Sequence, residues 1–206
     1  AAEHAPHPDD SLSALELQES LLEHRLEEAA TKTRLVRGLA EAQSQRTFNQ
    51  EQYDVQHYDL DIEIFPNPEE IQGVVTTTVI VTGDPISILE LNLDTNMNVS
   101  AVTAGGAPAT FSHSNDILTI NLDRTYNLGE TVLVSVTYDG DPAGDAFGWS
   151  SHSGNDMIWS LSEPFGARTW WPCKDLNTDK SESIDIRITV PDNGLIVASN
   201  GLLIAE

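Results

Sequence analysis

One segment of the sequence places an acid among aromatic side chains. Residues 159–180 read WSLSEPFGARTWWPCKDLNTDK and contain three tryptophans, one phenylalanine and two prolines. The pattern is neither alternating nor helical, so we interpret the segment as an irregular one. In such a setting the carboxylate of Glu163 is suited to hold a cation, such as the α-ammonium group of a peptide. The alternative is a structural role, in which Glu163 caps a turn or pairs with Arg168.

Other chemistries have weaker support. Of the six histidines, only His4 and His7 have a ligand-like spacing, and the helical zinc signature His-Glu-x-x-His is absent. Residues 148–152 (GWSSH) match a nucleophile elbow for three residues only, and we interpret them as a polar loop. Cys173 follows a proline and has no histidine near it in the sequence, so we predict a buried structural thiol. We assign no catalytic residue and no metal ligand to this chain.

Composition excludes several classes of function. The 206 residues carry 33 acids and 10 lysines and arginines, a formal net charge of −23. A field of that sign repels nucleic-acid phosphates and anionic lipid headgroups. No apolar run reaches the roughly 18 residues of a membrane span. A single cysteine excludes an internal disulfide and a cysteine-rich zinc module. The first residues, Ala1 and Ala2, begin no signal peptide, so we expect a processed chain, an excised piece or a fragment.

The chain divides into two parts with different periodicity. Residues 1–50 are predicted to form a disordered terminus and a helical leader, with Ser13 and Glu16 as a capping box. The alternative for this helix is a coiled-coil partner. Residues 51–206 alternate apolar and polar side chains, as half-buried strands do. We predict a mainly β fold, an antiparallel β-sandwich or saddle-like domain with an N-terminal α-helical leader. The expected strands are 58–64, 75–81, 86–93, 98–103, 117–122, 131–138, 184–190 and 195–199.

The aromatic segment resembles a known family. Residues 162–175, followed by Asp179 and Lys180, are similar to the signature of the N-terminal domain of M1-family zinc aminopeptidases. That signature is a Glu-Pro or Gln-Ala step, then Ala-Arg, then Pro-Cys-x-Asp, then a lysine opening the next strand. Residues 53–60 resemble the opening strand of that domain and residues 197–201 its closing strand. The resemblance covers roughly residues 53–206, and its Trp-Trp-Pro-Cys-Lys-Asp version is similar to secreted bacterial members.

The resemblance implies a role for each matching residue. It implies a saddle-like β domain that packs against a thermolysin-like catalytic domain and walls one side of the active site. Glu163 matches the position that helps bind the substrate α-amine, and Leu161 replaces a glutamine found in many relatives. The remaining matches are expected to hold the loop: Arg168, Trp170, Trp171, Pro172, Cys173, Asp175 and Lys180.

The resemblance also implies what lies outside this chain. Zinc is expected in the full-length enzyme, with ligands that this chain does not contain, so we expect the chain to be inactive by itself. Its expected partners are its own downstream catalytic domain and the N-terminus of a peptide substrate, with no nucleic acid and no membrane span. We expect a secreted or periplasmic location.

Two alternatives remain. The chain is either an enzyme domain or a non-catalytic β-sandwich module that binds protein or carbohydrate, because a fold does not determine function. A downstream His-Glu-x-x-His motif favours the enzyme. The helical leader is, on a further hypothesis, a pro-segment or an oligomerisation element.

Overall fold

The computed structural model describes residues 22, 33, 46–142, 144, 146–152, 154–163, 165–192 and 194–205. The predicted terminus and leader up to residue 45 lie outside the described residues, apart from positions 22 and 33. The prediction of a mainly β fold is confirmed. In chain order the elements are η1 (Asn49–Glu51), β1 (Tyr53–Pro66), β2 (Glu69–Val81), β3 (Ile86–Asn92), β4 (Asn98–Ala104), β5 (Ala107–Pro108), β6 (Phe111–Ser114), β7 (Ile117–Tyr126), β8 (Thr131–Gly140), β9 (Phe147–His152), β10 (Asn155–Ser160), η2 (Ala167–Thr169) and β11 (Ser183–Thr189).

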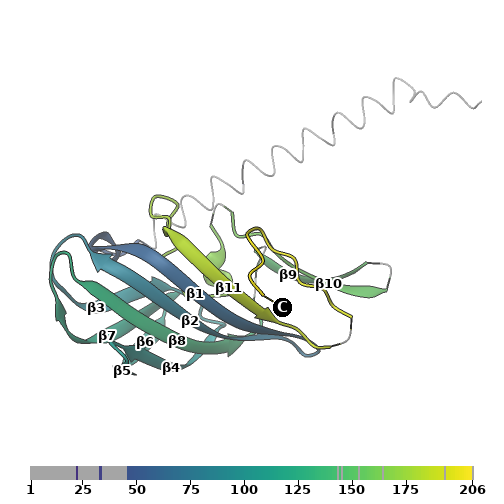
Figure 1. The fold of residues 1–206 in the computed structure, drawn as a ribbon, viewed down its shortest axis with the longest axis horizontal. Helices are drawn as coiled ribbons and strands as arrows, with labels where there is room; N and C mark the ends of the chain where they lie inside the picture. The colour runs from purple at the N-terminus through teal and green to yellow at the C-terminus, as the bar shows by residue number, and fades with distance from the viewer. Residues whose placement is uncertain are drawn as a thin grey trace, which may run out of the picture.

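The strands form two sheets and a separate hairpin (Figure 1). The larger sheet has the order β11-β1-β2-β8-β4-β5, the smaller one β3-β7-β6, and β9 pairs with β10. The pairs are antiparallel except for β1 and β11, which run parallel. Alternation along β1 sets the faces, because Leu60 and Ile62 are fully buried whereas Asp61 between them is exposed. The acidic residues of this strand therefore lie on its solvent face.

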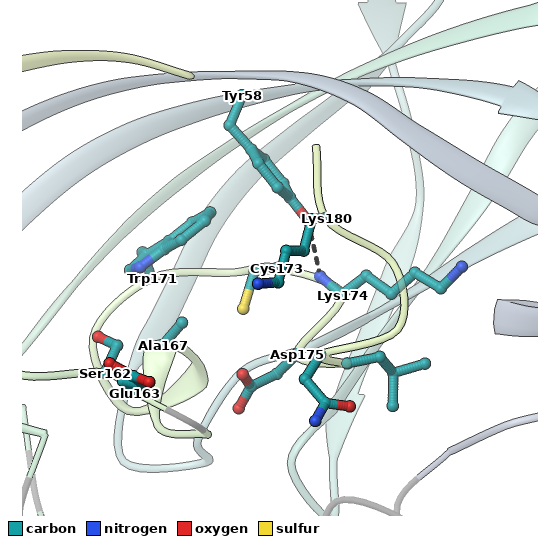
Figure 2. Close-up of a pocket in the computed structure, with 11 residues that line it drawn as sticks. Tyr58, Ser162, Glu163, Ala167, Trp171, Cys173, Lys174, Asp175 and Lys180 are labelled. Carbon is teal, nitrogen blue, oxygen red and sulfur yellow. Dashed lines mark hydrogen bonds between the residues drawn. The ribbon is translucent and has the colours of Figure 1, made fainter. Parts of the chain in front are cut away.

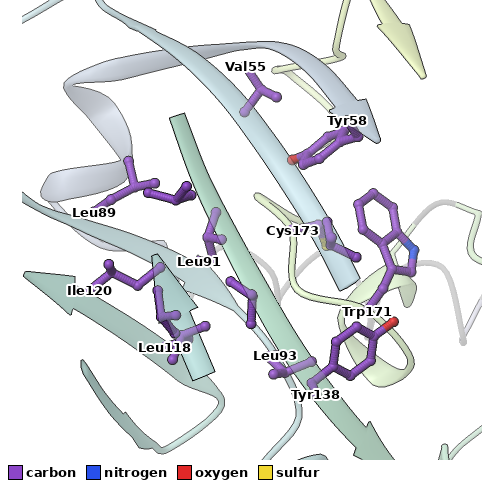
Figure 3. Packing of buried hydrophobic residues seen from close by; sticks show 14 of the residues in the cluster. Val55, Tyr58, Leu89, Leu91, Leu93, Leu118, Ile120, Tyr138, Trp171 and Cys173 are labelled. Carbon is purple, nitrogen blue, oxygen red and sulfur yellow. The ribbon is translucent and has the colours of Figure 1, made fainter. Parts of the chain in front are cut away.

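The core joins the two sheets to the aromatic segment (Figure 3). Leu91 of β3 and Leu118 of β7 are fully buried in one cluster with the inward residues of β1, β2 and β8. Burying a leucine side chain stabilises a fold by about 1.5–3 kcal/mol. Trp171 and Cys173 belong to the same cluster, so the aromatic segment is anchored in the core of the domain.

Three predictions about the strands were wrong. Residues 148–152 are strand rather than polar loop, because Phe147 and Trp149 pack toward the core while Gly148 leaves room for the Trp159 ring on the opposite face. A Cβ atom on Gly148 would lie 2.5 Å from that ring. Phe111–Ser114 form β6, a strand that is not among those we expected, because we interpreted residues 112–116 as a connection.

The third difference concerns the predicted strand at residues 195–199. These residues form no strand and belong to none of the sheets of the described chain. Ile196 is 92% exposed. An apolar run of this kind satisfies the composition of a strand but forms one only when a neighbouring strand supplies its backbone hydrogen bonds.

Candidate functional site

Glu163 lies near the start of the segment that connects β10 to β11. The segment begins where Leu161 N–H donates to the Ala146 carbonyl over 2.8 Å, which continues the β9–β10 ladder by one residue. Next to Glu163, the Ser162 hydroxyl oxygen accepts a 2.9 Å hydrogen bond from Trp170 Nε1. The backbone before Glu163 is therefore tied both to the hairpin and to the aromatic segment.

A buried ion pair closes the loop that carries Glu163. Asp175 Oδ2 accepts hydrogen bonds from Arg168 Nε over 2.7 Å and from the Gly166 N–H over 3.1 Å. The Arg168 and Asp175 side chains are only 11% and 7% exposed. Gly166 has a φ of 149°, and a Cβ atom there would lie 2.6 Å from the Ala146 Cβ. The turn after Glu163 thus depends on a glycine and on a charge pair protected from water.

Asn92, at the end of β3, fastens the middle of the segment to the smaller sheet. Its N–H donates to the Cys173 carbonyl over 2.7 Å, and its carbonyl accepts from the Cys173 N–H over 3.0 Å. The side-chain oxygen of Asn92 accepts from the Asp175 N–H over 3.1 Å and from Gln50 Nε2 over 2.8 Å. Because this oxygen is buried and uses two donors, replacing the side chain would leave both donors without a partner.

Lys174 fastens the same segment to β1 of the larger sheet. Its N–H donates to the Tyr58 hydroxyl over 2.9 Å, and its Nζ donates to the Tyr53 carbonyl over 2.6 Å and pairs with Asp179. The Lys174 and Asp179 side chains are 6% and 8% exposed. The Val55 N–H donates to Asp179 Oδ1 over 3.3 Å. Two buried ion pairs therefore brace the loop internally, and the contacts of Asn92, Lys174 and Asp179 hold it against both sheets.

Aromatic rings fill the space between these polar anchors. Tyr58 and Trp171 meet edge to face with ring centroids 4.8 Å apart, and Trp170 lies 6.1 Å from Trp171. Phe147 of the hairpin lies 5.5 Å from Trp170. Such contacts contribute about 0.5–1.5 kcal/mol each beyond area burial. The rings link β1, the loop and the hairpin into one packed unit.

Cys173 is buried in this unit and is suited to packing rather than to nucleophilic chemistry. Its side chain is 2% exposed, and no disulfide involves it. Burial, with the nearby Asp175 charge, raises the pKa of the thiol well above its ordinary value. Because the thiolate is the nucleophilic form, the Cys173 thiol is unreactive in the folded chain.

The loop and β1 line an open pocket of about 530 Å³ (Figure 2). Glu163 and Ser162 lie on one side, and Lys180 enters from the loop on the other side. Glu163 and Lys180 are exposed, whereas the other charged lining residues, Lys174 and Asp175, are buried in ion pairs. The lining residues are Tyr58, Ser162, Glu163, Ala167, Trp171, Cys173, Lys174, Asp175, Leu176, Asn177 and Lys180.

The histidines and acids of the described residues are the side chains that could bind a metal ion. Within the part of the chain that the structure describes, no group of three or more His, Cys, Asp or Glu side chains could hold a metal ion. His57 Nδ1 lies 2.8 Å from the Ser183 hydroxyl, and His113 Nε2 lies 2.8 Å from the Leu93 carbonyl. The described residues do not fit a zinc ion. In the same residues, no helix has the length and apolarity to cross a membrane.

Comparison with known families assigns the chain. A family model described as the peptidase M1 N-terminal domain matches residues 54–206. The chain belongs to the peptidase M1 family. This match begins at β1 and includes the pocket and the two buried ion pairs. A search of curated proteins gave no match.

Solved M1 structures have the same fold. An M1 zinc metallopeptidase from Deinococcus radiodurans is 33% identical, with a TM-score of 0.58 over 68% of this chain and 33% of that chain. A mutant of the Deinococcus radiodurans enzyme bound to a Tyr-Ser-Ala substrate matches with the same identity, TM-score and coverage. Leukotriene A4 hydrolase from yeast is 21% identical, with a TM-score of 0.59 over 69% of this chain and 24% of that chain, a likeness of fold alone. Our M1 chain spans about a third of the length of the Deinococcus enzyme.

The M1 segment brings most of the predicted residues to one place. Glu163, Trp171, Cys173, Asp175 and Lys180 all line the pocket. The other predicted residues lie behind it: Arg168 and Pro172 are buried, and Trp170 is half-buried.

Sequence analysis missed three anchors of the M1 loop, namely Asn92, Lys174 and Tyr58. Asn92 and Tyr58 are distant in sequence from the segment they bind, so no local pattern marks them. Lys174 lies inside the motif. The available signal for Lys174 was its place next to a cysteine that was predicted to be buried. A lysine that is buried with such a neighbour needs a partner for its charge.

Proposed function

We propose that this chain walls the active site of a zinc aminopeptidase of the M1 family and that Glu163 binds the α-ammonium group of the peptide substrate. The observation that carries the proposal is the position of Glu163, an exposed carboxylate at a pocket whose wall is held by two buried ion pairs. A carboxylate held at a constant place selects peptides with a free amino end and positions their first peptide bond. The Tyr-Ser-Ala substrate of the Deinococcus enzyme is a peptide of the required kind.

In this proposal the hydrolytic chemistry belongs to a catalytic domain elsewhere in the full-length enzyme. Zinc bound there would supply an activated water, and the chain described here would be inactive by itself. The chain contributes binding and orientation through Glu163. A secreted or periplasmic location belongs to the same proposal and is supported by the similarity of the Trp-Trp-Pro-Cys-Lys-Asp run to secreted bacterial members.

We assign the catalytic domain to the exposed face of the β9–β10 hairpin. Met157 and Trp159 of β10 and Leu161 just after it follow one another at alternate positions and are 47%, 40% and 61% exposed. The opposite face of the hairpin packs on the core through Phe147 and Trp149. A row of exposed apolar side chains next to Glu163 is typical of an interface, and two thirds of the Deinococcus enzyme lies outside the matched region.

The test is the variant Glu163→Ala in the full-length enzyme. We expect kcat/KM for aminoacyl p-nitroanilides to fall about ten- to hundredfold, because hydrogen bonds between charged groups contribute about 1.5–3 kcal/mol. Zinc content should not change. Glu182→Ala is the matched control, since Glu182 is an exposed glutamate at the far end of the same segment and does not line the pocket. Equal kinetics for the wild type and the Glu163 variant would remove Glu163 from the site.

A further inference from the structure

Lys180 differs from the other basic residues that the structure describes. Arg46, Arg124, Arg168, Lys174 and Arg187 each form an ion pair with an acid. Among the described lysines and arginines, Lys180 has no such pair, although the chain carries 33 acids. An exposed cation is easily paired in so acidic a chain. Its position at the pocket therefore calls for a ligand that carries negative charge.

The pocket holds two opposite charges that do not neutralise each other. Glu163 and Lys180 both line it and are both exposed, and they form no ion pair with each other. The remaining charged lining residues, Lys174 and Asp175, are committed to Asp179 and Arg168. A ligand that satisfies the two free groups has an ammonium group at one end and a carboxylate at the other.

The size of the pocket gives the scale of a ligand that can span it. A volume of about 530 Å³ equals that of a sphere about 10 Å across. An extended peptide advances at most about 3.3–3.6 Å per residue, so about three residues fit between the two walls. Figure 2 shows the Lys180 side chain running into the pocket from the side opposite Glu163. This arrangement suits a di- or tripeptide with both termini free.

We propose that Lys180 binds the C-terminal carboxylate of short peptides whose α-ammonium binds Glu163, so that the pocket selects dipeptides and tripeptides. The ammonium half of this inference rests on the proposed function, whereas the carboxylate half rests on Lys180. The net charge of −23 repels a peptide carboxylate from most of the surface. Lys180 offsets that repulsion at one point of the pocket.

The experiment measures peptide binding by isothermal titration calorimetry, using the complete protein that contains this chain. The probe is Leu-Gly-Gly with a reduced first peptide bond, which cannot be hydrolysed, and the second probe is its C-terminal amide. We expect Lys180→Gln to weaken binding of the acid about two- to fivefold and to leave the amide unchanged. Lys180→Arg should keep the preference for the acid. In the wild type, added salt should reduce the difference in affinity between the acid and the amide.

Two control variants separate this inference from the proposed function. Arg187→Gln removes another exposed cation, one that lies outside the pocket, and should not change the acid–amide difference. Glu163→Gln should weaken the binding of both probes by the same factor. If Lys180→Gln affects acid and amide alike, or neither, the carboxylate site is refuted. If Glu163→Gln changes neither probe while Lys180→Gln still acts on the acid alone, the ammonium anchor fails and the carboxylate site stands.

Discussion

The buried ion pair between Arg168 and Asp175 allows a sharp test of how the loop is held. The variant Asp175→Asn keeps the shape of the side chain and removes its charge, which leaves the guanidinium of Arg168 buried without a counter-charge. The two side chains are only 11% and 7% exposed. Breaking a buried pair by removing one partner costs about 3–5 kcal/mol, because the remaining charge is poorly solvated. That loss is a large part of the 5–15 kcal/mol by which a typical domain is stable.

The chain contains a matched control for this variant. Arg187 Nη2 lies 2.6 Å from Asp59 Oδ1, close to the 2.7 Å of the buried pair, but the Arg187 and Asp59 side chains are 57% and 36% exposed. Exposed pairs contribute about 0–1 kcal/mol. We therefore expect Asp59→Asn to have little effect on the free energy of unfolding. The two ion pairs have the same residue types and similar distances, and they differ mainly in burial.

Urea denaturation at pH 7 measures both variants. Asp175→Asn should lower the unfolding midpoint with an unchanged m-value, and its melting temperature should fall by about 6–20 °C. The double variant Arg168→Met with Asp175→Asn should recover part of the loss, since no unpaired charge remains. Small and equal losses for Asp175→Asn and Asp59→Asn would refute the idea that burial of this pair controls the stability of the loop.

Three further predictions concern the same segment. Gly166→Ala should lower the free energy of unfolding by about 1–3 kcal/mol, because it adds a clash with Ala146 to an unfavourable φ; Gly129→Ala has the φ penalty without a neighbour within 4 Å and should cost less in the same urea assay. Cys173 should resist iodoacetamide at pH 8 until the chain unfolds, as mass spectrometry can follow. Because burial raises the pKa of this thiol, the unfolded chain loses the proton first, so folding stability should decline as pH rises above the ordinary thiol value of 9.0.

The glycine and alkylation predictions each have an outcome that would contradict them, and stability that is independent of pH above 9.0 would contradict the third. Equal losses for the two alanine variants would mean that the Ala146 contact is relieved at no cost. Alkylation of Cys173 at the same rate in folded and unfolded chain would mean that the segment opens readily. In that case the anchors at Asn92 and Lys174 would not hold it.

Most strands could be predicted from composition and alternation in the sequence, whereas the short strands β5 and β6 and the β9–β10 hairpin could not. β1, β2 and β8 alternate buried, mostly apolar residues with more exposed, mostly polar ones, and this pattern is visible in the residue order. β9 was missed because its glycine, serines and histidine are typical of loops. Its strand state depends on Trp159 of the neighbouring strand, which covers Gly148. Residues 195–199 have strand composition but belong to no sheet of the described chain. Pairing decides both cases, and pairing is not a local property.

The site shows the same division. Residues of the motif meet at one pocket because they are close in sequence, so Glu163, Asp175 and Lys180 could be grouped before the structure was known. The contacts that anchor the loop could not be predicted from the sequence. They involve Asn92 and Tyr58, which lie 83 residues from Asp175 and 116 residues from Lys174. Long-range contacts of this kind arise from sheet packing and leave no period in the sequence.

The way this loop is held affects how variants of the pocket should be interpreted. Arg168, Lys174, Asp175 and Asp179 are buried and act on stability, whereas Glu163 is exposed and is free to act on a ligand. If Glu163 binds the ammonium group equally in the ground state and the transition state, its loss raises KM and leaves kcat unchanged. If it instead orients the peptide bond for attack, kcat falls as well. A loop fastened to both sheets favours the second result, because a carboxylate carried on an anchored backbone can fix the direction of the peptide as well as its affinity.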